Sequence, residues 1–209
     1  MKVLIACEFS GIVREAFKAK GHDAWSCDLL PTEIPSEKHI QDDVLKHLND
    51  GWDLMIAHPP CTYLSRAGAR WWKDKLRQQQ ADKAAEFVFN LRDAPIERIV
   101  IENPIGQLNQ RWRYPEQTIH PYMFGEPYSK ATCLWLKNLP LLKPTKILDK
   151  YEPFVACNRS ARKRKGLPIK GIVSGGKKAS ITFKGIAEAM AEQWGNLELA
   201  PAQKKQEMK

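Results

Sequence analysis

The sequence has few cysteines and lacks the spacings from which cysteine frameworks are built. Their number is odd, and none forms a CxxC pair. This pattern argues against a disulfide framework and against a thiolate zinc site, and the five histidines show no metal-ligand spacing either. We therefore expect no bound metal, a reducing cytoplasmic environment, and free thiols at Cys7, Cys27, Cys61, Cys133 and Cys157.

Long apolar runs are also missing. No stretch approaches the roughly 18 to 20 apolar residues of a membrane-spanning helix. The opening MKVLIACEF is too short an apolar run for the core of a signal peptide. The 209 residues are 43% hydrophobic, enough to bury the core of one domain with a small appendage. The composition argues against a membrane-spanning chain and against a wholly disordered one.

Acidic residues are scarce in the C-terminal third, where the net charge of +9 is concentrated. Between Lys143 and Lys184, twelve lysines and arginines stand against Asp149 and Glu152, and many of them gather in RSARKRKGLP and SGGKK. Clustered cations beside glycine and proline are typical of a surface that neutralises phosphates. The alternative interpretation is a solvated loop that lysines keep soluble.

Apolar segments of two periods alternate along the chain. Short apolar runs predict strands within 3–7, 22–28, 53–57, 98–103 and 132–137. Apolar residues at helical spacing predict helices within 12–21, 74–93 and 183–195. This alternation predicts the α/β fold class, with a mostly parallel central sheet and helices on both faces.

Candidate ligand-binding residues follow the predicted strands, where α/β sheets bind their ligands. These strand-end motifs are EFSG, CD, QDDV, HPPC and ENP. A glycine loop with an acid about 20 residues later, here Gly11 and Asp28, is the arrangement that binds an adenosine ribose. The two prolines of HPPC fix their φ angles and remove backbone donors, so the turn holds Cys61 in place.

Together these motifs resemble those of the DNA cytosine-5 methyltransferases, from residue 3 to about 138 and again in the last predicted helix. FSG (9–11) is similar to the family's first motif, and PCTYLS (60–65) to its Pro-Cys motif. ENP (102–104) resembles its Glu-Asn-Val motif, and TFKGIAEAMAEQWG (182–195) its last one. The resemblance implies the Rossmann-like fold of S-adenosylmethionine-dependent methyltransferases, in a small member of phage or bacterial type.

The resemblance also implies a chemical role for each motif. Cytosine C5 is too weak a nucleophile to take a methyl group directly, so the thiolate of Cys61 would first add to C6. Glu102 would protonate or hydrogen-bond N3, and a partly dry carboxyl can keep the proton that it must share. Because C5 and C6 are buried in a duplex, the base must flip out. The implied catalytic set is Cys61, Glu102, Asn103, Ser65 and Lys130.

The implied cofactor is S-adenosylmethionine, and the implied partner is DNA, which we expect to be double-stranded. Asp28 falls where the family binds the ribose, and Asp43 where it meets the adenine amine. The cofactor-binding set is Phe9, Ser10, Gly11, Ile12, Val13, Asp28, Leu29, Asp43, Pro59, Lys184, Gly185 and Ile186. We expect DNA contacts from Arg66, Arg70, Arg159, Arg162, Lys163, Arg164, Lys165, Lys177 and Lys178.

Several positions depart from the family pattern. Cys7 replaces the acid expected before FxG, and Glu8 is displaced by one residue, which turns a strand side chain to the opposite face. His58 stands where a small residue is usual. The other departures are Val13 for the second glycine, Lys130 and Thr132 for two arginines, and Lys184 for the cofactor-contacting asparagine. These changes would alter the donor pocket or the reaction rate.

The predicted domain organisation is a catalytic core (1–139), a short basic recognition insert (140–181), a final helix that returns to the core (182–196) and a flexible tail (197–209). The family usually places a large target-recognition domain before its final helix. About 40 residues can grip phosphates but offer few side chains that read base edges. The sequence therefore predicts a short or relaxed target site, or dependence on a partner.

Plainer interpretations and rival functions remain open. Cys61 could fill the core, Asp43 could cap a helix that begins at Val44, and we expect Trp71 and Trp72 to pack beneath the loop. The rival functions are a non-catalytic nucleic-acid-binding protein derived from a methyltransferase, and a similar enzyme that uses a modified donor. An exocyclic-amine methyltransferase fits HPPC poorly, and an RNA cytosine-5 enzyme would carry a second cysteine near ENP.

Overall fold

A seven-stranded sheet in the order β3-β2-β1-β4-β5-β8-β6 forms the centre of the computed structural model, which describes residues 1–155, 171, 173 and 176–197. The strands are β1 (Lys2–Ala6), β2 (Asp23–Cys27), β3 (His39–Ile40), β4 (Leu54–Ala57), β5 (Arg98–Pro104), β6 (Gln117–Ile119) and β8 (Thr132–Lys137). The five strands from β3 to β5 are parallel to one another. β8 is antiparallel to β5 and to β6.

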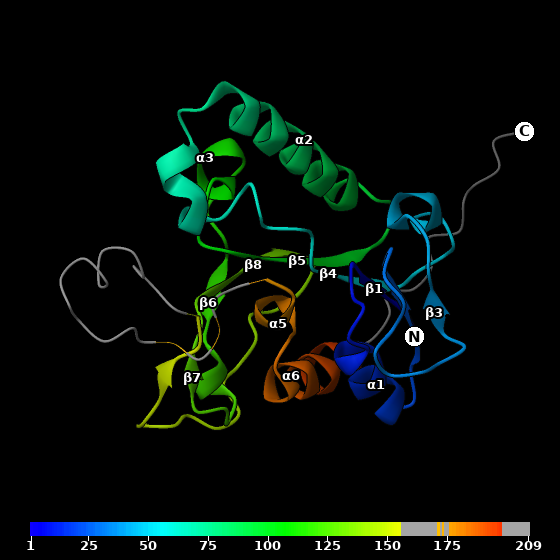
Figure 1. Cartoon of the computed structure of the whole chain (residues 1–209). Coiled ribbons are helices and arrows are strands. Elements are labelled where there is room, and N and C mark those ends of the chain that lie inside the picture. The colour runs from blue at the N-terminus through cyan, green and yellow to red at the C-terminus, as the bar shows by residue number, and fades with distance from the viewer. Residues whose placement is uncertain (156–170, 172, 174–175, 198–209) are drawn as a thin grey trace, which may run out of the picture.

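Helices cover both faces of this sheet, as Figure 1 shows. α1 (Ile12–Ala19) and α6 (Lys184–Gly195) lie on one face, and α2 (Lys75–Arg92) and α3 (Leu108–Arg111) lie on the other. β1 and β4 read as continuous apolar runs because both of their faces are buried. On the α1 and α6 face the core includes Val13, Phe17 and Trp194, and on the α2 face it includes Val88 and Trp135.

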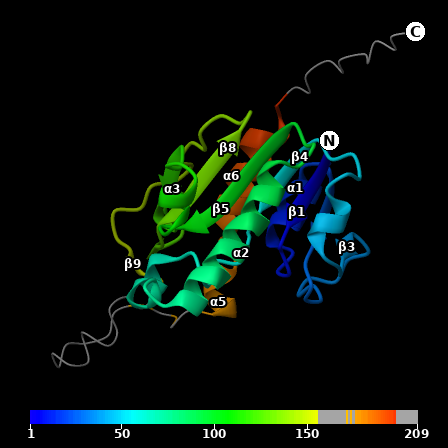
Figure 2. The same cartoon turned by 90° about the horizontal axis from the view of Figure 1, so that it is seen from above.

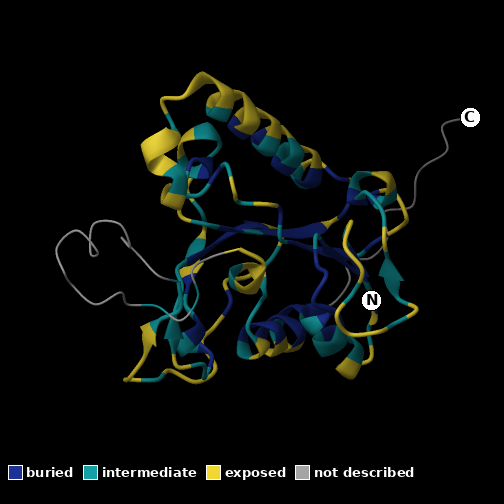
Figure 3. Cartoon of the chain, viewed as in Figure 1, coloured by how far each residue is buried: buried dark blue, intermediate teal, exposed yellow. Residues whose placement is uncertain are grey.

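The final helix α6 packs in the same core as β1, although the two are far apart in the sequence. Met190 and Trp194 of α6 are fully buried in the same cluster as Val13 and Phe17 of α1, and the dark blue stretches of both helices in Figure 3 face the sheet. The Trp194 Nε1 donates to the Pro140 carbonyl at 3.0 Å. α6 therefore closes the face of the sheet that carries the amino-terminal helix.

Short elements occupy the connections. The 3-10 helices of the described residues are η1 (Val44–His47), η2 (Arg66–Trp71) and η3 (Pro121–Met123), and a small second sheet pairs β7 (Tyr128–Ser129) with β9 (Glu152–Pro153). α5 (Lys177–Ser180) precedes α6. Figure 2 shows η2, β9 and α5 gathered at the end of the sheet toward which the β5 arrow points. The ligand-binding end predicted from the sequence is therefore flanked by short segments.

The Rossmann-like α/β fold class predicted from the sequence is confirmed, with a mostly parallel sheet and helices on both faces. Every predicted strand and helix is present, with ends within about two residues of the prediction. The strands β3, β6, β7 and β9 were not predicted. No helix in the described ranges is long and apolar enough to cross a membrane.

Candidate functional site

The carboxyl ends of β1, β4 and β5 lie side by side at the predicted ligand-binding end. The register pairs Ala6 with Ala57, and Ala57 with Ile101. The next residue along each strand is Cys7, His58 and Glu102, respectively. Residues at equal register in parallel strands project from the same edge. The sheet therefore brings together strand ends that are drawn from positions 7, 58 and 102 of the chain.

Glu8 binds the first turn of α1. Its carboxylate accepts from the backbone N–H groups of Val13 at 2.7 Å and Arg14 at 3.2 Å, and from the Ser10 hydroxyl at 3.1 Å. The first N–H groups of a helix have no partner within it, so a carboxylate there satisfies two of them. Burial raises the pKa of Glu8, while the His58 charge and these hydrogen bonds oppose that rise.

The FSG loop is held in an unusual conformation by these contacts. Cys7 has a φ of 60° and Gly11 a φ of 78°, both in the left-handed region. A non-glycine residue adopts that region at a cost, so the surrounding structure must hold Cys7 there. A Cβ on Gly11 would lie 2.7 Å from the Arg14 Nη2. Glycine is therefore required at position 11 both for its conformation and for the close approach of Arg14.

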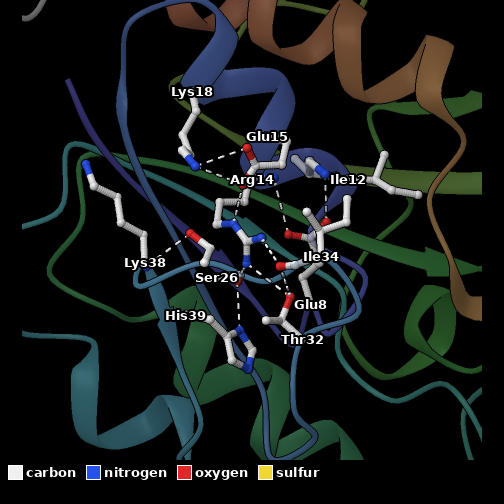
Figure 4. Close-up of polar contacts among 12 residues, drawn as sticks. Glu8, Ile12, Arg14, Glu15, Lys18, Ser26, Thr32, Ile34, Lys38 and His39 are labelled. Atoms are coloured by element: carbon white, nitrogen blue, oxygen red, sulfur yellow. Dashed lines mark hydrogen bonds and ion pairs between the residues drawn. The ribbon is translucent and has the colours of Figure 1, made fainter.

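Arg14 joins the FSG loop to the segment after β2, as the close-up in Figure 4 shows. Its side chain is fully buried. The guanidinium donates to the Ser26 hydroxyl at 2.7 Å and to the Ile34 carbonyl at 2.7 Å, and its Nε contacts Glu15 at 2.9 Å. Ser26 also contacts the His39 Nδ1 at 2.8 Å. Arg14 thus fixes the chain that follows β2 against the helix that follows β1.

Replacing this buried side chain should cost stability. Arg14→Met keeps the length of the side chain but removes every donor, so the Ile34 carbonyl and the Ser26 hydroxyl lose a buried partner. We expect the free energy of unfolding to fall by about 2 to 3 kcal/mol, measured by urea denaturation. The control Arg92→Met removes a partly exposed guanidinium paired with Asp93, which should cost under about 1 kcal/mol. Equal losses for the two variants would contradict the assigned role of Arg14.

The predicted cofactor carboxylates lie near Cys7 at the ends of β2 and β3. The Asp28 Oδ1 accepts from the Leu30 N–H at 2.9 Å, and the Asp43 Oδ1 accepts from the Leu45 N–H at 3.0 Å and so caps η1. Burial raises the pKa of Cys7 well above its ordinary value, and the charges of Asp28 and Asp43 add to that rise. Both carboxylates therefore act on the same thiol.

Apolar side chains beside Asp28 are exposed. Leu29 is 71% exposed, and Leu30 and Ile34 are also exposed. Exposed leucines next to a carboxylate offer an apolar surface and a hydrogen-bond acceptor side by side. Phe9, by contrast, is buried, and the Lys177 Nζ lies 4.4 Å from the centroid of its ring. Because Lys177 also pairs with Glu33 at 3.0 Å, its charge is engaged at the FSG loop.

The turn that carries Cys61 is tied to the end of β5. The Asn103 Nδ2 donates to the Pro59 carbonyl at 3.0 Å, and Asn103 is buried. The Gln107 N–H donates to the Leu64 carbonyl at 2.7 Å, and the Ser65 N–H donates to the Cys61 carbonyl at 2.9 Å. Backbone and amide bonds on both sides of Cys61 therefore hold the turn against β5. Asn103 acts on the turn from the α2 face of the sheet, whereas Glu102 faces α6.

Gly106 allows this close approach. A Cβ at position 106 would clash with the Leu64 carbonyl oxygen, because the two backbones pass in contact there. Ser65 and Gly106 form an isolated bridge at the same point. Only a glycine leaves room for another backbone at so short a distance.

Cys61, Glu102 and Lys130 act on one another at the centre of the site. The His58 Nδ1 lies 3.0 Å from the Glu102 Oε2, and both side chains are largely buried. Burial of Glu102 favours its neutral form, but the His58 hydrogen bond and the Lys130 charge outweigh this and lower its pKa. Burial and the Glu102 charge raise the pKa of Cys61, whereas Lys130 lowers it. The expectation that burial keeps a proton on Glu102 is therefore opposed by its partners.

A small pocket opens beside His58, Glu102 and Lys130. His58, Glu102, Lys130 and Thr132 line it, and Phe183, Ile186 and Met190 of the final helix segment close its other side. The His58 Nε2 is buried without a hydrogen-bond partner among the described residues. An unpartnered buried nitrogen in a pocket wall is suited to a polar ligand group.

Lys130 should control the reactivity of the Cys61 thiol. Because its charge lowers the pKa of Cys61, Lys130→Met should raise that pKa further, leaving less thiolate at any given pH. We expect the rate of iodoacetamide alkylation of Cys61, followed by peptide mass spectrometry, to fall severalfold at pH 8 and to recover at higher pH. Lys143→Met, which removes an exposed lysine, is the matched control. An unchanged pH profile in the Lys130 variant would contradict the coupling.

The other predicted site residues lie at the edges of the cluster. Lys184 is exposed and pairs with Glu188 at 3.5 Å, while the buried Ile186 lines the pocket. A Cβ on Gly185 would clash with the Phe124 carbonyl, so this glycine lets α6 approach η3. Ser10, Ile12 and Val13 belong to the FSG loop and the start of α1.

The predicted DNA-contacting residues fall into three groups. Arg66 and Arg70 are exposed on η2, and Lys178 is exposed on α5. Lys177 contacts Phe9 and Glu33 instead of standing free. The remaining predicted contacts, Arg159, Arg162, Lys163, Arg164 and Lys165, lie outside the described residues.

The sequence missed two features of the site. The burial of Arg14 could not be predicted, because an arginine within a predicted helix is ordinarily expected to be exposed. In the sequence, His58 was noted only as a departure from the family pattern before PPC. The signal that could have identified it is its position one residue after a buried strand, which places it level with Glu102. No group of three His, Cys, Asp or Glu side chains suited to a metal ion is found in the described part of the chain.

Comparisons with known proteins leave this site to be judged on its own geometry. No protein-family model and no curated protein sequence matches the chain. Among solved structures it is similar to one described as a "putative DNA modification methyltransferase encoded within prophage Cp" from E. coli, with 16% identity and a TM-score of 0.47. The match covers 71% of this chain and 52% of that one, so the chain spans about half the length of that protein.

Proposed function

We propose that the protein is a DNA cytosine-5 methyltransferase that uses S-adenosylmethionine. The observation that carries the proposal is the hydrogen-bonded pair of His58 and Glu102 in a pocket wall that Lys130 shares, with the turn of Cys61 bonded to β5 through Asn103. A thiol, a carboxylate and a cation at one end of the sheet are the groups that nucleophilic addition to a pyrimidine ring requires. The motif resemblance supports the same chemistry.

In the proposed reaction the Cys61 thiolate adds to C6 of a flipped cytosine. Electron density moves to C5 and N3, and the hydrogen-bonded pair of His58 and Glu102 supplies the proton that neutralises N3. After the methyl group is attached to C5, a base removes the C5 proton. The Cys61 thiolate then leaves C6 as the C5–C6 double bond re-forms, and the N3 proton returns to the pair of His58 and Glu102, which restores the free enzyme. Lys130 offsets the negative charge that Cys61 and Glu102 bring to one site.

The residues near β1 and β2 fit an S-adenosylmethionine site. The Asp28 carboxylate suits ribose hydroxyls, and the exposed Leu29 beside it suits the face of an adenine. We assign Asp43 to the adenine amine, as the resemblance implies, although its carboxylate also caps η1. When bound there, S-adenosylmethionine supplies an electrophilic methyl group. Glu8 and Arg14 hold the FSG loop that would face it.

We further propose that target recognition is short or relaxed. The insert 140–181 between β8 and the final helix offers cations for phosphates but few side chains for base edges. Bisulfite sequencing of DNA modified in vitro should show methylation in a one- or two-base context. A strict site of six base pairs would contradict this part of the proposal.

The decisive experiment uses a duplex that carries 5-fluorocytosine. Fluorine cannot leave as a proton does, so the adduct between Cys61 and C6 should persist as a complex stable in denaturing gels when S-adenosylmethionine is present. Nucleoside mass spectrometry of unmodified DNA should then detect 5-methylcytosine. If neither an adduct nor a methylated product were detected, the result would favour the non-catalytic binding protein. If a donor purified from cells gave a modified cytosine of a different mass, the result would favour the enzyme that uses a modified donor.

A further inference from the structure

The segment 62–77 exposes apolar side chains among cations next to the reactive turn. Trp71 is 48% exposed and Leu76 is 72% exposed. Trp71 was expected to pack beneath the loop, and its exposure is a correction, whereas the Trp72 Nε1 is buried. A large indole held in solvent has given up burial that the core could have offered. Trp71 therefore presents an aromatic side chain to solvent beside the turn that carries Cys61.

The charge of this segment is one-sided. Arg66, Arg70, Lys73, Lys75 and Arg77 stand against a single acid, Asp74, which accepts from the Arg77 N–H at 2.9 Å. None of the five cations forms an ion pair within the ranges that the structure describes. Uncompensated cations on one short surface segment attract a polyanion.

The indole is oriented and not merely exposed. The Arg70 guanidinium carbon lies 5.1 Å from the centroid of the Trp71 ring, within the range of a cation–π contact. The Trp72 N–H donates to the Ala69 carbonyl at 3.2 Å, which fixes the end of η2. The segment begins directly after Cys61. Its Arg66 N–H donates at 2.9 Å to the carbonyl of Ile105, the residue that follows β5.

We propose that the exposed face of 62–77 binds a DNA strand, with Trp71 stacking on a base next to the flipped cytosine and the surrounding cations binding phosphates. This inference rests on the proposed function, because it takes the partner to be the DNA that presents the cytosine to Cys61. Alternating cations and an exposed aromatic ring are the means by which proteins hold unpaired nucleic acid: the ring stacks on any base, and the cations follow the backbone.

The test measures binding without donor and without cytosine. Fluorescence anisotropy would compare labelled oligothymidylate with an abasic strand of the same number of phosphates. Trp71→Ala should weaken binding to oligothymidylate about five- to 100-fold and change binding to the abasic strand less than twofold. Trp71→Phe should restore most of the affinity, because a phenyl ring also stacks.

Two further variants separate stacking from charge. Arg70→Ala should weaken binding to both oligothymidylate and the abasic strand. It should also reduce the slope of log affinity against log salt concentration by about 0.7. Lys83→Ala, an exposed lysine of α2 outside the segment, should change neither ligand. If Trp71→Ala affected both ligands equally or affected neither, the surface would be a general polyanion site or no nucleic-acid site, and the inference would be overturned.

The outcome is independent of the cysteine chemistry. Binding that depends on Trp71 together with no adduct on 5-fluorocytosine DNA would reject the proposed methyl transfer but keep this interface. An adduct that forms with Trp71→Ala as readily as with the wild type, at subsaturating DNA, would reject the interface and keep the chemistry.

Discussion

Cys61→Ser should abolish adduct formation on 5-fluorocytosine DNA and lower the rate of methyl transfer by about 10⁴-fold or more. The hydroxyl keeps nearly the size of the thiol but is a far weaker nucleophile at neutral pH, and loss of a covalent nucleophile typically has effects of this size. Cys61 is only half-buried, so the variant should fold normally. The rate of tritiated methyl incorporation into DNA measures the loss.

Lys83→Ala is the control, because it changes an exposed side chain of α2 outside the segment 62–77. It should keep both adduct formation and methyl transfer within a few-fold of the wild type. Methyl transfer by Cys61→Ser above about a tenth of the wild-type rate would show that the thiol does not add to the base. The pocket would then have to serve a reaction without a covalent enzyme intermediate.

Glu102→Gln should lower methyl transfer by about 10² to 10⁴-fold while making the Cys61 thiol more reactive. The amide retains the shape of the carboxylate but cannot share a proton with His58 and N3 in the same way. Because the Glu102 charge raises the pKa of Cys61, its removal should lower that pKa and speed alkylation of Cys61 at neutral pH. The rate of methyl transfer should therefore fall while the rate of Cys61 alkylation rises.

Glu97→Gln provides the control, since it removes an exposed carboxylate just before β5. It should leave both measurements unchanged. If Glu102→Gln lost both methyl transfer and alkylation of Cys61, the variant would have lost the folded structure of the site. Circular dichroism would show whether the variant is folded. Unchanged transfer in Glu102→Gln would remove the carboxylate from the proposed mechanism.

The main elements could be predicted because their patterns were strong. The apolar runs of β1, β4 and β5 are buried on both faces, and α2 follows the helical period over eighteen residues. The short β3 and β6 carry too few residues for any period to appear. The direction of β8 could not be read either, since a buried strand has the same composition whether it is parallel or antiparallel.

The electrostatics of the candidate site could not be predicted from the sequence. Cys61, Glu102 and Lys130 were grouped through the family resemblance, and the order of strands, which places β4 next to β5, came only from the structure. The ionisation of Glu102 depends on His58, a contact between neighbouring strands that sequence spacing does not report. The exposure of Trp71 was missed because a tryptophan pair beside a loop is by composition more often packed than solvated.

The glycine at 106 gives the molecule a mechanical property. Because the backbone that follows the thiol rests on the backbone that follows the carboxylate, with no side chain between them, the two reactive groups share one rigid support. Their separation cannot be adjusted by changing side chains around the cavity alone. Any redesign of the reaction geometry would have to begin with this backbone crossing, and a larger residue there would displace nucleophile and acid together.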